Sequence, residues 1–241
     1  MSPFYRATPN PSAPWSNVAG SRQDGRVSEN PILDPDAVLW SGEPAGRTLL
    51  VLLHGYGADE RDLFALTPHL PAEFAIAAVR APLEPPFPTP GRSWYPIEGL
   101  ESRDAVHTTR AAHALLTWLD EVASEATSIG LLGFSQGAAV ALQALRLDPE
   151  RFAFVINLSG YATPGELPGD ADLAERRPPV FWGRGALDEV IPAALVLHTT
   201  DWLPGHSDLV GRIYPELRHA VSEHELADVR AFLEKQLGQL G

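Results

Sequence analysis

Short apolar runs alternate with longer amphipathic segments along the chain after residue 36. Six runs of five or six residues, each bounded by turn residues, span 48–53, 74–79, 128–133, 152–157, 179–183 and 209–214. Such runs are too short for helices and are typical of strands buried on both faces. The pattern therefore predicts six strands of a buried sheet.

Segments with helical periodicity lie between the runs, and 104–123 is the clearest of them. Its apolar side chains fall near one stripe of a helix: Val106, Ala114, Leu115, Trp118, Leu119 and Val122. Alternating strands and helices predict a mostly parallel sheet with helices on both faces. We expect a single α/β domain over 37–241, with ligands binding where the strands end.

Residues 1–36 are predicted to form a partly ordered leader, because they are rich in Pro, Ser, Asn and Gly and show neither a helical nor a strand periodicity. They also lack the charged and apolar regions of a secretory signal, and no apolar run in the chain exceeds six residues. We therefore expect no membrane span and a cytoplasmic location.

Charge and cysteine content narrow the chemistry. The formal net charge is −13, and the chain has no cysteine. An acidic protein is not expected to bind nucleic acid or an anionic membrane, because both attract clustered Lys and Arg. A thiolate metal site and a cysteine nucleophile are excluded. We expect a small neutral or apolar substrate and a nucleophile of another kind.

Ser135 is the candidate nucleophile, since it lies between Gly133 and Gly137 in the pattern GxSxG. About 0.1 such matches are expected by chance in a chain of this composition, so the context must support the motif. A predicted strand precedes the serine and a predicted helix follows it, which is the setting of a nucleophile elbow. The alternative is a serine that only caps the helix.

A serine nucleophile needs a histidine base further along the chain. His219 follows the run 209–214 and precedes a helix whose start carries Ser222 and Glu225 at capping-box spacing. His224 falls in the first turn of that helix, and His206 precedes its strand at the opposite edge of the sheet. We therefore favour His219.

The acid that orients the base is expected after the run 179–183, where Asp188 lies in a turn. The neighbouring Glu189 is the alternative acid, although its position is typical of a residue that leads into the next helix. Asp201 and Asp208 lie on or after that helix and read as solvated carboxylates. Asp188 is the preferred acid.

The oxyanion donors are expected from main-chain N–H groups of Tyr56 and Gln136. Tyr56 lies in the sequence HGYG directly after the run 48–53, and its glycines allow close approach of the backbone. An ordinary glycine turn is the alternative interpretation of HGYG.

Five segments in order carry a family resemblance: HGYGADERDLFAL, GFSQGAAVAL, INLSGY, FWGRGALDEVIP and YPELRHAVSEHEL. Over residues 38–238 the chain resembles the phospholipase/carboxylesterase family of α/β-hydrolases, which includes acyl-protein thioesterases and small bacterial carboxylesterases. The resemblance implies an α/β-hydrolase fold, Ser135, Asp188 and His219 as the catalytic triad, and Tyr56 and Gln136 as oxyanion donors. Arg218 and Ala138 depart from the glycines that many members carry, and Arg218 is expected to narrow the entrance or bind a substrate carboxylate.

A long segment with six prolines, 81–103, resembles a stiff flap over an acyl pocket. Its candidate substrate-binding residues are Phe87, Trp94, Tyr95 and Ile97. The alternative is a packed surface loop whose aromatic side chains cover the core.

We predict a serine carboxylesterase that hydrolyses short- to medium-chain esters through an acyl-enzyme. Its partner is a small-molecule ester, and a homodimer is a further hypothesis. No HExxH or GxGxxG motif occurs in the sequence, so neither a metal nor a cofactor is expected. The alternatives are a thioesterase or lysophospholipase acting on longer acyl chains, and a non-catalytic binding protein with the same fold.

Overall fold

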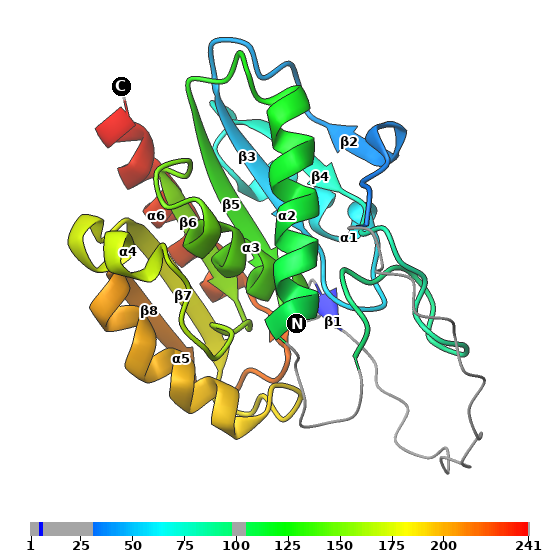
Figure 1. Ribbon diagram of the computed structural model, residues 1–241, viewed down its shortest axis with the longest axis vertical. Coiled ribbons are helices and arrows are strands. Elements are labelled where there is room, and N and C mark those ends of the chain that lie inside the picture. The colour runs from blue at the N-terminus through cyan, green and yellow to red at the C-terminus, as the bar shows by residue number, and fades with distance from the viewer. Residues whose placement is uncertain (1–4, 7–30, 98–104, 241) are drawn as a thin grey trace.

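Seven strands form one sheet in the computed structural model, which describes residues 5–6, 31–97 and 105–240 (Figure 1). Their order is β2-β4-β3-β5-β6-β7-β8. The strands are β2 (Val38–Trp40), β3 (Thr48–Leu53), β4 (Ala75–Val79), β5 (Ser128–Phe134), β6 (Phe154–Leu158), β7 (Pro179–Gly185) and β8 (Asp208–Tyr214). Every pairing is parallel except that of β2 with β4. The six predicted strands and the mostly parallel sheet are confirmed.

Two features of the sheet differ from the prediction, and both lie at its edges. Strand β2 was not predicted, because its three residues are too short to display a period. Strand β8 was predicted to be buried on both faces, but it pairs only with β7 and leaves Ile213 64% exposed. An edge strand pairs on one side only, and helices cover its faces less completely than those of a central strand. The two kinds of strand can therefore have similar apolar sequences while their side chains differ in burial.

Helices cover both faces of the sheet (Figure 1). One core cluster joins Leu49, Val51 and Leu53 of β3 to α2 (Ala105–Val122), α3 (Gln136–Leu147), α4 (Asp170–Arg176) and α5 (Ala193–His206). The other joins Leu50 and Leu52 to α1 (Glu60–Phe64) and α6 (Glu223–Leu240). The period of two along β3 therefore divides the core into two layers.

Helix α2 confirms the predicted helix within one residue at each end, but its buried stripe is shifted. Val106 is 53% exposed, whereas Thr108 and Ala111 are buried. Two residues correspond to about 200° around a helix, so Val106 and Thr108 lie on opposite faces. The stripe that includes Thr108 packs against the sheet.

The strand order places two loops beside each other at the carboxyl edge of the sheet. Strands β3 and β5 pair directly, with Leu53 opposite Gly133. The chain leaves β3 toward β4 on one side and leaves β5 toward β6 on the other. This change of direction is a topological switch point, where ligands bind in sheets of this kind. The loops after β3 and β5 are those that carry Tyr56 and Ser135.

Most of the predicted leader, residues 1–4 and 7–30, lies outside the described residues. Tyr5–Arg6 forms a short strand, β1, which pairs antiparallel with β9 (Ala220–Val221). No strand was predicted there, because two residues carry no period. Leu33, at the end of the predicted leader, is only 4% exposed and belongs to the core.

Candidate active site

Ser135 occupies a sharp turn between β5 and α3. Its φ of 54° lies in the left-handed region, which non-glycine residues rarely adopt. The turn is packed so closely that a Cβ on Gly137 would lie 2.0 Å from the carbonyl oxygen of Leu53. The Ser135 side chain makes no capping hydrogen bond to α3. The serine is therefore at the N-cap position of the helix, but its hydroxyl serves another contact.

That contact is His219, and Asp188 lies behind it. His219 Nε2 lies 2.8 Å from Ser135 Oγ, and His219 Nδ1 lies 2.8 Å from Asp188 Oδ2. A carboxylate only accepts hydrogen bonds, so Nδ1 carries the imidazole proton and Nε2 accepts from the serine hydroxyl. The three side chains therefore form the chain of hydrogen bonds that a serine nucleophile requires.

The surroundings of Asp188 keep its carboxylate charged. Burial disfavours the charged form, but the hydrogen bond from His219 and the electrostatic interaction with its ring outweigh it, together with N–H donors from Val190 and Ile191. The net effect is a pKa of Asp188 below its usual value. Because its side chain is 1% exposed, the carboxylate faces the imidazole and these donors rather than solvent.

The rival acids and bases lie apart from these three side chains. Glu189 is exposed, and its Oε2 lies 3.7 Å from Nη1 of Arg218, which is also exposed. The Asp201, Asp208 and His224 side chains are exposed as well. His206 stacks on Trp202 at the end of α5. Asp188 and His219, and none of these rivals, are in the hydrogen-bonded group with Ser135.

Only half of the capping box predicted after His219 is present. Ser222 Oγ accepts a hydrogen bond from the Glu225 N–H at 3.2 Å. The Glu225 carboxylate does not return the bond, and within the described part of the chain neither of its oxygens has a partner. It lies instead against Gly183 of β7, where a Cβ would come within 2.3 Å of Oε1. Burial raises the pKa of this carboxyl to about 8.

The expected oxyanion donors are the main-chain N–H groups of Tyr56 and Gln136. Tyr56 lies in the loop after β3, and Gln136 is the first residue of α3. Among the residues described, neither N–H donates to another group of the chain. Two unpaired donors on adjacent loops beside the serine are what stabilisation of a tetrahedral intermediate requires.

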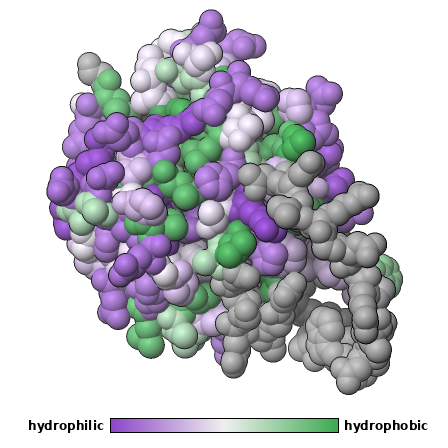
Figure 2. All heavy atoms as spheres, in the orientation of Figure 1, coloured by the Kyte–Doolittle hydropathy of each residue, from purple (hydrophilic) through white to green (hydrophobic). Residues whose placement is uncertain are grey.

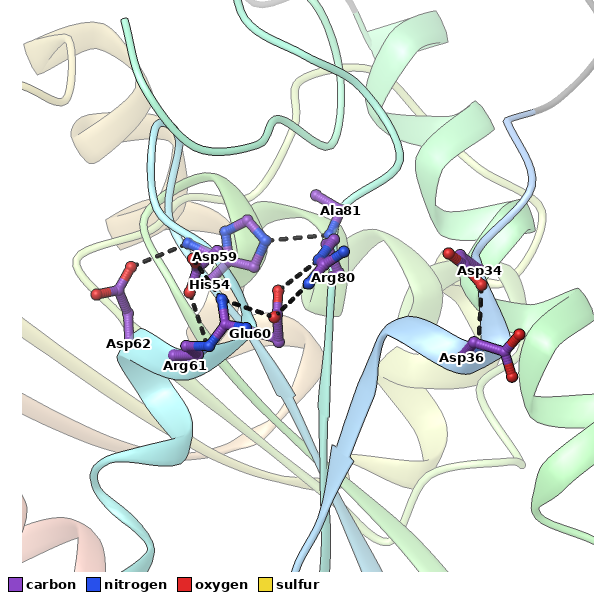
Figure 3. Close-up of polar contacts among 9 residues, drawn as sticks. All are labelled: Asp34, Asp36, His54, Asp59, Glu60, Arg61, Asp62, Arg80 and Ala81. Carbon is purple, nitrogen blue, oxygen red and sulfur yellow. Dashed lines mark hydrogen bonds and ion pairs between the residues drawn. The ribbon is translucent and has the colours of Figure 1, made fainter.

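The His54 side chain links the loop after β3 to the segment after β4 (Figure 3). Its Nδ1 lies 2.8 Å from the Gly55 carbonyl oxygen, and its Nε2 accepts the N–H of Ala81 at 3.0 Å. Burial lowers the pKa of His54, so the ring is neutral. In the same region Glu60 and Arg80 form two hydrogen bonds, of 2.6 and 2.7 Å, which hold α1 to the end of β4.

The four predicted substrate-binding residues do not share one environment. Trp94 and Tyr95 are buried, at 1% and 2% exposure. Phe87 is 97% exposed and Ile97 is partly exposed. Aromatic character alone could not separate these cases, because buried and exposed loop aromatics look alike in sequence. Residues 98–103 of the predicted flap lie outside the described residues.

The described residues contain no group of three or more His, Cys, Asp and Glu side chains placed to hold a metal ion. None of their helices is long and apolar enough to cross a membrane. On the face seen in Figure 2 the residues that are not grey are mostly hydrophilic, with small, separate apolar areas between them.

Comparison with known proteins identifies the family. The family model described as Phospholipase/Carboxylesterase matches residues 35–237. Acyl-protein thioesterase 1 of Saccharomyces cerevisiae is 29% identical over 109 residues, which cover 44% of this chain and 48% of that protein. The chain therefore spans about half the length of the acyl-protein thioesterases that it matches first. Esterase YpfH of Escherichia coli is 26% identical over 201 residues, or 78% of this chain and 83% of that protein.

A solved structure supports the fold independently. The crystal structure of a carboxylesterase from Mesorhizobium loti has a TM-score of 0.71 with this chain at 22% identity, and covers 86% of this chain and 99% of its own. At that identity the likeness is one of fold alone. The family match over residues 35–237 shows that the protein belongs to the phospholipase/carboxylesterase family of α/β-hydrolases, a family of hydrolases acting on esters and thioesters.

Proposed function

We propose that the protein is a serine hydrolase that cleaves short- to medium-chain carboxylic esters through an acyl-enzyme. The observation that carries the proposal is the pair of 2.8 Å contacts that link Ser135 Oγ to His219 and His219 to Asp188. A serine hydroxyl is a weak nucleophile until a base removes its proton, and this arrangement supplies that base.

Acylation begins when Ser135 Oγ attacks the carbonyl carbon of the ester and its proton moves to His219 Nε2. The carbonyl oxygen becomes an oxyanion, which accepts hydrogen bonds from the N–H groups of Tyr56 and Gln136. Asp188 stabilises the imidazolium by accepting from Nδ1. His219 then gives its proton to the departing alcohol, which leaves the acyl group on Ser135.

Deacylation repeats the sequence with water as the nucleophile. His219 takes a proton from the water, which attacks the acyl carbon, and the same N–H groups bind the second oxyanion. Collapse of this intermediate returns the proton from His219 to Ser135 Oγ and releases the carboxylic acid. No further proton carrier is needed, because the imidazole alternates between base and acid.

A fluorophosphonate probe and p-nitrophenyl acetate test the proposal together. We expect the probe to label Ser135 and the Ser135→Ala protein to fold normally but lose both labelling and hydrolysis. Ser159→Ala is a matched control, because Ser159 also has a positive φ, 49°, and directly follows the neighbouring strand β6. Labelling that survives in the Ser135→Ala protein, or hydrolysis at the wild-type rate, would overturn the assignment.

The main alternative is hydrolysis of long-chain thioesters or lysophospholipids by the same three residues. It is favoured by the similarity to proteins named acyl-protein thioesterase 1, whereas the similarity to esterase YpfH favours esters. Matched series of esters and thioesters with acyl chains from acetyl to palmitoyl separate the two, with kcat/KM as the measured quantity. A non-catalytic binding protein, the remaining alternative, would not react with the fluorophosphonate.

A further inference from the structure

The two oxyanion donors lie on different loops, and no short stretch of chain holds them at a set distance. Tyr56 follows β3, whereas Gln136 begins α3 after β5. An oxyanion hole works only when both N–H groups are aimed at the same point before the reaction starts. Some other part of the molecule must therefore set the spacing between the loops.

Trp94 lies between the two loops and is bonded to both. Its main-chain N–H donates to Gln136 Oε1 at 2.8 Å, and its indole Nε1–H donates to the His54 carbonyl oxygen at 2.8 Å. His54 is two residues before Tyr56, and Gln136 is itself the second donor. One buried residue thus joins the segments that carry both donors.

The Gln136 side chain is held at both ends of its amide. Besides accepting from Trp94, it donates from Nε2 to the Tyr95 carbonyl oxygen at 2.7 Å and to Ser93 Oγ at 3.2 Å. Gln136 is 3% exposed, and any other orientation of its side chain would lose these bonds. The position of Gln136, the residue after Ser135, is therefore held by its side-chain hydrogen bonds as well as by its place in α3.

Backbone pairing completes the connection on the side of the first loop. Gly57 N–H donates to the Arg92 carbonyl oxygen at 2.9 Å, and Arg92 N–H donates to the Ala58 carbonyl oxygen at 2.7 Å. The contact is close enough that a Cβ on Gly91 would lie 2.3 Å from the Gly57 oxygen. The segment 91–95 thus fills the space between the two oxyanion loops.

We infer that Trp94 and the Gln136 side chain are positioning residues that set the distance between the Tyr56 and Gln136 N–H donors. This inference rests on the proposed serine hydrolase function and adds a specific role for the segment 91–95. Neither side chain touches the reacting atoms. Loss of either link changes the alignment of the donors with the oxyanion, and a misplacement of about 1 Å costs about a hundredfold in rate.

The test uses Trp94→Phe, which removes the indole N–H, and Gln136→Met, which keeps the length of the side chain and the main-chain N–H. The matched control is Trp118→Phe, in α2. Trp118 is also buried, at 3% exposure, but among the described residues its indole N–H has no hydrogen-bond partner. Trp94→Phe and Trp118→Phe remove the same atoms from a buried indole, and only the variants at Trp94 and Gln136 break hydrogen bonds of the connection.

Three quantities are measured on each variant: kcat and KM for p-nitrophenyl acetate, the inhibition constant of an aryl trifluoromethyl ketone, and the midpoint of thermal unfolding. Ser135 Oγ adds to the ketone carbon, its proton moves to His219, and the ketone oxygen becomes the bound oxyanion. Affinity for this inhibitor therefore reports the oxyanion hole directly.

We expect Trp94→Phe and Gln136→Met to lower kcat about tenfold to a hundredfold, with KM within about twofold, and to weaken the ketone by the same factor. Trp118→Phe should lower the unfolding midpoint and leave the other quantities at wild-type values. Unchanged ketone affinity in the folded Gln136→Met protein, or a loss of kcat no greater than that of Trp118→Phe, would overturn the inference. If wild-type protein is not labelled by a fluorophosphonate, the proposed function fails, and the inference fails with it.

Discussion

His219 Nε2 lies 2.8 Å from Ser135 Oγ, although 84 residues separate them in the chain. The strand order explains the proximity, because β5, which ends at Phe134, and β7 and β8, which precede Asp188 and His219, all run parallel. Their carboxyl ends meet at one edge of the sheet. The loops that follow them therefore converge on the same small region.

The first prediction concerns the carboxylate behind this pair. We expect Asp188→Asn to lower kcat by about 10⁴, because an amide cannot hold the imidazole proton on Nδ1. Asp201→Asn is the control, since Asp201 is an exposed carboxylate on α5. Hydrolysis of p-nitrophenyl acetate measures both variants. Equal activity of the two variants would show that Asp188 does not orient the base.

The second prediction concerns the packing of the nucleophile turn. Gly137→Ala should reduce activity and stability together, because the new Cβ would lie 2.0 Å from the Leu53 oxygen and force α3 away from β3. Gly238→Ala in α6 has nothing within 4 Å of its Cβ and should stabilise the protein by about 0.5–1 kcal/mol. Thermal unfolding and ester hydrolysis compare the two. A fully active Gly137→Ala protein would contradict the close packing of this turn.

The third prediction concerns Glu225, whose pKa in the folded protein is about 8 against 4.5 when it is exposed. Between these values the folded state holds a proton that the unfolded state has lost. The free energy of unfolding therefore falls with rising pH, by about 1.4 kcal/mol per unit. Glu225→Gln should remove this dependence and make the protein more stable than wild type at pH 8.

Denaturant unfolding at pH 5 and pH 8 measures the effect of Glu225. Glu223→Gln is the matched control, because Glu223 lies in the same helical turn with an exposed side chain. Parallel stability curves for wild type and Glu225→Gln would show that the buried carboxyl titrates normally.

The fourth prediction concerns the buried ion pair below the oxyanion loop. Arg80 hydrogen bonds, opposed in part by burial, lower the pKa of Glu60 to about 2. Arg80→Leu removes both short hydrogen bonds of the buried Glu60 carboxylate and leaves it the longer contact with Arg61 Nη1 at 3.5 Å, which should cost about 3 kcal/mol near pH 7. The loss of stability caused by Arg80→Leu should become smaller as the pH falls from 4.5 toward 2, because the carboxyl of Glu60 takes up a proton over this range.

Arg230→Leu is the control for the ion pair at Arg80. Arg230 and Glu234 form a pair on the surface of α6, with both side chains more than half exposed. Removing such a pair should change the free energy of unfolding by no more than about 0.5 kcal/mol. Equal losses in the two variants would show that the Glu60–Arg80 pair contributes no more than a surface contact.

Local patterns in the sequence predict most of the fold and the three side chains of the proposed active site. Runs of apolar residues identify β3 to β8, and the GxSxG pattern between a strand and a helix identifies Ser135. The order of elements leads from there to Asp188 and His219. These features are readable because the period of a strand or helix, and the turn residues at its ends, depend on neighbouring residues alone.

The support of the site depends on the tertiary structure. Trp94 was predicted to be a substrate-binding residue and Gln136 a main-chain oxyanion donor, and the structure adds a hydrogen bond from the Trp94 N–H to the Gln136 side chain. The Glu225 carboxylate was expected to cap a helix and is instead buried against Gly183. Each of these contacts joins segments far apart in the chain, and their distances follow from the strand order and the packing of the layers. A periodic pattern shows that a side chain is apolar or polar and which face of an element it occupies, but it does not show which other segment meets that face.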